Sequence, residues 1–165
     1  MESGRGRSYL KWCLKQNNGI KLQKPSENLA RAYLGKSRNA LKSMRVNAEA
    51  EIIDWAVSAS YYAKYFAVYA LFWKLGVKCE IHECTISLFE YLFRGKVSDD
   101  LIRELRESKE SRIEAQYYTT KISVDSGMIT RQTTAFVLKI EEMIDSLDQS
   151  AVAELQSKLR EIEAR

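Results

Sequence analysis

The stretch from residue 54 to residue 76 constrains the fold more than any other segment. It reads DWAVSASYYAKYFAVYALFWKLG and is apolar on nearly every side when drawn as a helix. Small residues form one line along it. A second line, at steps of three and four, holds large aromatic rings and one alanine: Trp55, Ala59, Tyr62, Phe66, Tyr69 and Trp73. A helix that is apolar all round is a buried helix. The sequence therefore predicts a buried central helix from about residue 48 to residue 75.

A membrane-spanning helix is the alternative explanation of this stretch. Such a helix needs about 20 mostly apolar residues. Here Asp54, Lys64 and Lys74 interrupt the run, and four tyrosines add hydroxyl groups. These interruptions favour the central helix of a bundle in a protein without membrane contact.

Cysteine usage predicts reduced thiols. The chain has three cysteines, Cys13, Cys79 and Cys84, and its N-terminus lacks the apolar core of a secretory signal. An odd count in that context indicates a cytoplasmic protein with free thiols. Cys79, His82 and Cys84 are spaced as C-x2-H-x-C, which has no visible fourth ligand and matches no usual zinc pattern. We therefore expect buried thiols there, with no metal and no cofactor.

Charge is distributed unevenly along the chain. Residues 1–45 hold 11 of the 26 Lys and Arg residues but only two of the 22 acidic residues. That segment is strongly basic, and the remainder is acidic on balance. The basic segment suits a polyanion such as RNA, although the acidic part of the same chain or an acidic partner would also satisfy it.

Turn and capping residues divide the chain into helices. We expect a basic N-terminal arm at 1–24, a helical bundle at 25–148 and a C-terminal helical extension at 149–165. Gly76 ends the central helix. Four residues are the expected N-caps of bundle helices: Ser26, Asn47, Ser98 and Thr130. No stretch alternates with period two, so the sequence predicts an all-α fold, an up-and-down antiparallel bundle of four to five helices.

The run RIEAQYY, at the end of the fourth predicted helix, holds candidate binding residues. Arg112 and Gln116 are four residues apart and share a face, and Tyr117 and Tyr118 follow them. An arginine beside hydroxyl and amide groups can bind a phosphate through two hydrogen bonds. The structural alternative is that Arg112 pairs with an acid such as Glu114 or Glu51 and that both tyrosines lie at the edge of the core.

The single histidine, His82, begins the third predicted helix. The positive end of the helix dipole lowers the pKa of a histidine there and favours the neutral imidazole. Such a ring suits a hydrogen-bond acceptor or a base, and a structural histidine with satisfied hydrogen bonds is the alternative.

Four ordered stretches resemble the HEPN domain family (higher eukaryotes and prokaryotes nucleotide-binding), most closely its small archaeal and bacterial members. They are WCLK with GIKL, PSENLARAYLGKSRNAL, SASYYAKYFAVYALFWKLGVKCEIHECTI and RIEAQYY. The resemblance implies an up-and-down bundle that pairs into a homodimer. It also implies metal-independent RNA cleavage in many members. Many act with a small nucleotidyltransferase partner as a toxin–antitoxin pair.

The active members of that family carry an arginine, four to six variable residues and then a histidine. The resemblance implies that the arginine holds the scissile phosphate and that the histidine assists attack by the RNA 2′-hydroxyl. Arg112 matches the arginine, but Tyr117 stands where a histidine would follow. A tyrosine, with a pKa of about 10, is a poor general base at neutral pH, although it can donate a hydrogen bond to phosphate.

Three functions are consistent with these observations. The first is a module that binds a nucleotide or RNA around Arg112, Gln116 and Tyr118 and acts beside a nucleotidyltransferase, which the missing histidine favours. The second is a metal-independent ribonuclease that uses Arg112 with Tyr117 or His82. The third is a structural helical adaptor whose basic arm docks on an acidic surface.

Overall fold

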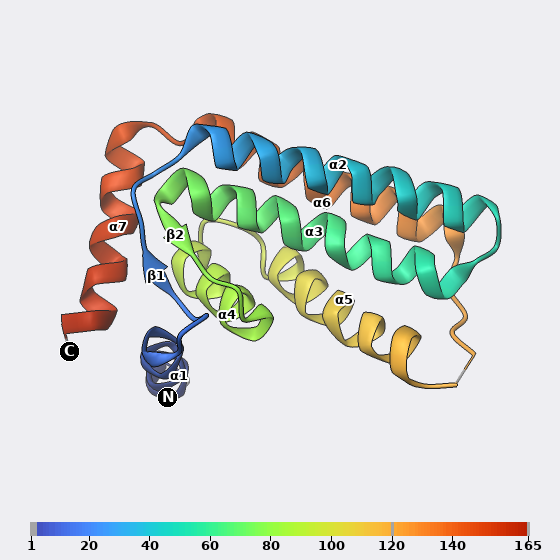
Figure 1. The fold of residues 1–165 in the computed structure, drawn as a ribbon, viewed down its shortest axis with the longest axis horizontal. Helices are drawn as coiled ribbons and strands as arrows, with labels where there is room; N and C mark the ends of the chain where they lie inside the picture. Colours follow the sequence, from blue (N-terminus) through green and yellow to red (C-terminus); the bar gives the residue numbers. More distant parts are fainter. Residues whose placement is uncertain (1–2, 120, 165) are drawn as a thin grey trace.

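A computed structural model describes residues 3–119 and 121–164 and confirms the all-α bundle (Figure 1). The described helices are α1 (Ser3–Lys15), α2 (Glu27–Glu49), α3 (Ile53–Leu75), α4 (His82–Phe93), α5 (Asp99–Tyr117), α6 (Ser126–Ser146) and α7 (Gln149–Ala164). Two short strands, β1 (Lys21–Leu22) and β2 (Val77–Lys78), pair antiparallel. Within the described residues, no helix is both long enough and apolar enough to cross a membrane.

The central helix of the bundle is α3. It packs most extensively against α2 and also contacts α5 and α6 (Figure 1). Its small-residue face is fully buried at Ala63, Ala67 and Ala70. The buried hydroxyl of Ser37, on α2, donates to the backbone oxygen of Ala63 at 2.7 Å. Small side chains on both helices therefore let the two backbones approach closely.

The start of α3 differs from the prediction. Asn47 lies inside α2, where its amide donates to the backbone oxygen of Ser43, and it caps no helix. Glu51 adopts a left-handed conformation with φ of 59°, which breaks the helix between residues 49 and 53. The predicted boundary between the two antiparallel helices therefore exists, but it lies at Glu51 and not at Asn47.

Most other predicted helix ends are confirmed. Ser26 and Ser98 accept hydrogen bonds from the backbone nitrogens of the third residues after them, as N-caps do. Gly76 ends α3 with φ of 75°, a conformation that favours glycine. Thr130 is a correction: α6 begins at residue 126, and its N-cap is Asp125, which accepts from the nitrogen of Met128 at 2.6 Å.

The predicted aromatic face of α3 is not its most buried face. Trp55 is 65% exposed, and Tyr62, Phe66 and Trp73 are only partly buried. The other sides of the helix hold the fully buried rings, among them Phe72. In Figure 1, α6 lies behind α2 and α3, and no helix crosses in front of them. Tyr62, Phe66 and Trp73 form a partly exposed side of α3, named the open face here.

Both ends of the chain contribute to one hydrophobic core. Leu10 and Ile20, from the N-terminal segment, are buried. Leu155, Leu159 and Ile162 of α7 join the same cluster. Accordingly, α1 packs against both α4 and α7.

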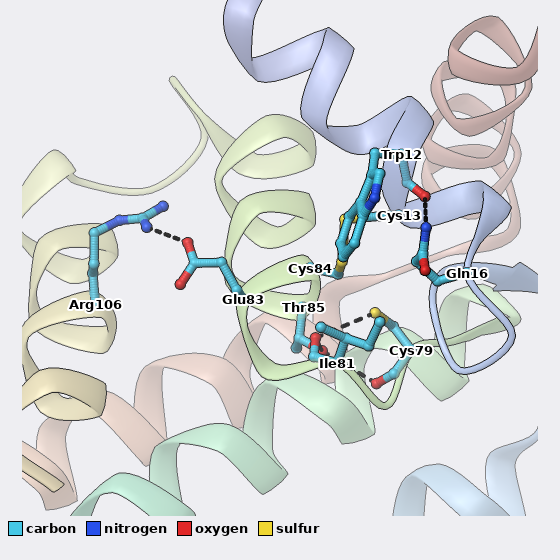
Figure 2. The surroundings of a disulfide bond; sticks show 9 residues. All are labelled: Trp12, Cys13, Gln16, Cys79, Ile81, Glu83, Cys84, Thr85 and Arg106. Carbon is cyan, nitrogen blue, oxygen red and sulfur yellow. Dashed lines mark hydrogen bonds and ion pairs between the residues drawn. A yellow bond between two sulfur atoms is a disulfide. The ribbon is translucent and has the colours of Figure 1, made fainter. Parts of the chain in front are cut away.

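The expectation of three reduced thiols is wrong. Cys13 of α1 and Cys84 of α4 form a disulfide, and Cys79 is buried as a free thiol (Figure 2). The Cys79 thiol contacts the backbone oxygen of Ile81 at 3.7 Å, and burial raises its pKa. Three cysteines can form one disulfide and leave one free thiol. The packing of α1 on α4 brings Cys13 and Cys84 together and so determines which two are bonded. The disulfide ties the N-terminal segment to the helix that begins at His82.

Candidate functional site

The candidate site centres on Arg112, near the C-terminal end of α5. Its Nη1 donates to the hydroxyl of Tyr62 at 2.8 Å. The guanidinium carbon lies 5.4 Å from the ring centre of Tyr61 and 5.5 Å from that of Tyr62, within cation–π range. Consecutive positions on α3 thus direct two tyrosines toward one arginine and fix its planar group.

Arg112 has no carboxylate partner among the residues that the structure describes, although salt bridges are frequent elsewhere on α5. The predicted structural alternative, a pair with Glu114 or Glu51, does not form. The Nε atom of Arg112 is buried and has no hydrogen-bond partner within the described ranges. A guanidinium held by aromatic groups, with donors to spare and no acid beside it, has the chemistry of an anion site.

His82 lies beside this arginine, although they are far apart in sequence. Its Nδ1 is 2.6 Å from the hydroxyl of Tyr61, and its ring stacks on Tyr65 at 4.2 Å with the planes 4° apart. Burial raises the pKa of Tyr61, so the hydroxyl keeps its proton. Nδ1 is the only acceptor that the described residues offer this hydroxyl. The hydroxyl therefore donates, which places the proton of the neutral imidazole on Nε2.

The pKa of His82 is lowered, as its position at the start of a helix suggested. Burial is the largest cause, and the positive charges of Arg112 and Lys109 add to it. The imidazole is therefore neutral near pH 7, with Nε2–H as a donor. Burial also raises the pKa of Tyr65 to about 12, so that ring stacks on His82 as a neutral phenol.

Glu83 fixes α4 to α5 next to the site. It accepts from Arg106 Nη1 and from Lys109 Nζ, both at 2.6 Å. Burial of the Glu83 carboxyl opposes ionisation, but the hydrogen bonds from Lys109 and Arg106 outweigh it and lower the pKa. Figure 2 shows Glu83 pointing from α4 to Arg106 of α5. These ion pairs hold the start of α4, and with it His82, against α5.

The other predicted site residues lie one turn further along α5. Gln116, Tyr117 and Tyr118 are exposed, and Tyr117 and Tyr118 are 72% and 62% exposed. Gln116 and Tyr117 border a hollow of about 350 Å³ together with four other residues: Asp54, Trp55, Ser58 and Ala115. The structure thus brings Arg112 and His82 to one cluster and sets Gln116 and Tyr117 around the adjacent hollow.

Sequence reasoning missed Tyr61, Tyr62 and Tyr65, which it assigned only to core packing. A signal was present, because a buried tyrosine hydroxyl needs a polar partner. Three tyrosines within five residues of one buried helix therefore required polar groups from neighbouring helices. Which groups these are depends on how α4 and α5 pack, and the sequence alone does not specify it.

The C-x2-H-x-C spacing does not converge on a metal. Cys84 is bonded to Cys13, and the Nδ1 of His82 is bonded to a tyrosine hydroxyl. Across residues 3–119 and 121–164, no three His, Cys, Asp or Glu side chains are placed to hold a metal ion.

The fold defines the chain as an all-α protein, an antiparallel helical bundle around one buried helix, with an arginine–tyrosine–histidine cluster at its open face. A model of the HEPN domain matches residues 30–150, which is most of the chain. The protein therefore belongs to the HEPN domain family, whose members are generally nucleotide-associated. A search of curated proteins found no match to this chain.

Proposed function

We propose that this protein is an interaction module that binds a phosphate of RNA or of a nucleotide at Arg112. One observation carries the proposal: the guanidinium is oriented by Tyr61 and Tyr62 and has no carboxylate partner among the described residues. A protein that needed Arg112 only for packing would leave its charge to water or pair it with an acid. A fixed guanidinium instead suits bidentate binding of a phosphate.

RNA is favoured over a lone phosphate because positive charge continues along the open face. Lys36 of α2 lies 5.4 Å from the ring centre of Phe66, and Phe66 stacks on Tyr62 with the ring centres 5.8 Å apart. Arg112 and Lys36 are therefore linked by two partly buried aromatic rings. Alternating cations and aromatic rings suit the phosphates and unstacked bases of a single strand.

Binding of a fluorescein-labelled single-stranded RNA, followed by anisotropy, tests this proposal. Arg112→Ala is expected to weaken binding markedly. Arg103→Ala is the matched control, because Arg103 is an exposed arginine on the same helix that pairs with Asp100 and Glu107. Arg112→Lys keeps the charge but loses the bidentate geometry, so we expect intermediate affinity. Equal affinity in the wild type and Arg112→Ala would overturn the proposal.

A metal-independent ribonuclease is the second candidate, and the position of His82 favours it. The Nε2–H of His82 can donate to phosphate or to a leaving oxygen beside Arg112, whereas Tyr117 lies on the exposed side of α5. Cleavage in excess chelator that is lost in both Arg112→Ala and His82→Ala, and kept in Tyr117→Phe, would establish this activity. Absence of cleavage in the wild type would leave the binding module as the function.

We also propose that the protein is a homodimer that acts with a small nucleotidyltransferase. Membership of the HEPN domain family supports a second copy of the chain as a partner, because these domains are often dimeric. Light scattering coupled to size exclusion tests the dimer, and a monomeric mass at every protein concentration would contradict it. Affinity purification from the native host tests the partner.

A further inference from the structure

The hollow beside Arg112 has features of a base-binding pocket. Two aromatic side chains, Trp55 and Tyr117, border it, and both are mostly exposed. Ligand pockets are typically concave and lined by aromatic side chains together with a few polar groups, which is the composition of this hollow. The volume of about 350 Å³ lies near the lower end of small-ligand pockets, which suits one nucleoside.

Two polar side chains of the hollow have no hydrogen-bond partner among the residues that the structure describes. The Asp54 carboxylate and the Gln116 amide make no side-chain hydrogen bond or ion pair with any described residue, and both are exposed. The Ser58 hydroxyl is satisfied within its own helix, because it donates to the backbone oxygen of Asp54 at 2.9 Å. A ligand in this hollow therefore meets one free carboxylate, one free amide and the two aromatic side chains that border it.

The antiparallel packing of α3 and α5 places this hollow one helical turn from the guanidinium. Arg112 and Gln116 are four residues apart on α5, and Tyr62 and Ser58 are four residues apart on α3. Four residues of helix span about 6 Å. That separation is within the reach of a single nucleotide, so its phosphate can lie at Arg112 while its base lies beside Trp55. The negative charge of Asp54 directs the phosphate to the arginine and away from the hollow.

We propose that the hollow binds the base of a guanosine phosphate, within single-stranded RNA or as a free nucleotide. A carboxylate accepts two parallel hydrogen bonds, and guanine alone among the four RNA bases offers two adjacent donors, N1–H and the N2 amino group, on its Watson–Crick edge. The amide of Gln116 supplies a donor for O6. Trp55 and Tyr117 supply the stacking surfaces. This inference rests on the proposed function, because it assigns the phosphate to Arg112.

Affinity for short fluorescein-labelled oligouridine strands that carry one central guanosine, adenosine or cytidine tests the proposal. We expect the wild type to prefer the guanosine strand by about 5- to 150-fold, the range that one bidentate contact contributes. Asp54→Asn should abolish this preference without weakening binding of the other strands. Asp145→Asn, which removes an exposed charge from α6, is the matched control and should retain the preference.

Two further variants separate the base pocket from the phosphate site. Trp55→Ala should weaken binding of the guanosine strand by at least about fivefold, as loss of one stacking partner does. Trp12→Ala, which removes a 46% exposed tryptophan from α1, should have no effect. Arg112-dependent binding without base preference, and without an effect of Trp55→Ala, would overturn the guanine site and leave the proposed function standing. Binding that ignores Arg112 would overturn both.

The free nucleotides distinguish the two sources of the guanosine phosphate. If GMP, but not AMP, competes with the strand at similar concentration and the competition requires Asp54, the natural ligand is a mononucleotide. If only the strand binds with this preference, the site reads RNA. Equal competition by GMP and AMP would contradict the assignment of Asp54.

Discussion

The disulfide between Cys13 and Cys84 should contribute strongly to stability. The two residues are separated by 71 positions, and the loop-closure relation for such a loop gives about 4 kcal/mol at 25 °C. The effect acts mainly on the unfolded chain, because Leu10 and Ile20 keep the N-terminal segment docked in the native state. Reduction should therefore lower stability while leaving the helical content unchanged. For a chain of this size, the loss corresponds to a fall in Tm of about 8–16 °C.

Urea unfolding followed by circular dichroism, with and without a dithiol reductant, measures this effect. The double variant Cys13→Ala with Cys84→Ala should be insensitive to the reductant. Cys79→Ala is the matched control, because it removes the free thiol and should leave the sensitivity intact. Under denaturing, non-reducing conditions, the wild type should show one reactive thiol. Three reactive thiols, or a reductant effect below about 1 kcal/mol, would contradict a stabilising Cys13–Cys84 disulfide.

Three further predictions follow from burial and charge. In urea melts, Phe72→Ala should lower the free energy of unfolding by about 3–5 kcal/mol, because Phe72 is fully buried. Phe66→Ala should cost clearly less, because Phe66 is only partly buried. Equal losses would contradict this difference in burial. An NMR titration of the imidazole should give His82 a pKa below 6.5. The signal identifies itself, because the chain has one histidine. Its contribution to stability should be complete above pH 6.5 and decline as pH falls through the lowered pKa, and His82→Asn should remove that decline. Glu104→Gln should lower the free energy of unfolding by an amount near the lower end of about 3–5 kcal/mol, because it leaves the buried ammonium of Lys64 without a carboxylate partner. Lys64→Met removes the buried charge itself and should cost less. The reverse order in urea melts would contradict this.

Local signals explain how much of the fold could be predicted. Gly76, Ser26 and Ser98 act through the backbone within a few residues, so their roles are visible in the sequence. The break at Glu51 is different, because Asn47 indicates a boundary nearby but its exact position depends on how α2 packs against α3. The same limit applies to Trp55, whose spacing places it in line with Tyr62, Phe66 and Trp73 but does not show that this side of α3 is only partly covered.

The candidate site was less predictable because it depends on long-range packing. Arg112 was identifiable from its own stretch, but its partner Tyr62 lies 50 residues away. His82 was identified as the single histidine, yet only the packing of α4 and α5 around α3 brings it to Arg112. The cysteines show the same dependence, since their number does not specify which pair lies within bonding distance.

The most direct test of the account is the salt dependence of single-stranded RNA binding by the wild type, Arg112→Ala and Arg103→Ala. Each phosphate contact contributes about 0.7 to the slope of log affinity against log salt concentration for single strands. We predict that Arg112→Ala weakens binding and reduces the slope by about that amount, while Arg103→Ala matches the wild type. Identical slopes and affinities for the wild type and Arg112→Ala would contradict the assignment of Arg112 as a phosphate-binding residue.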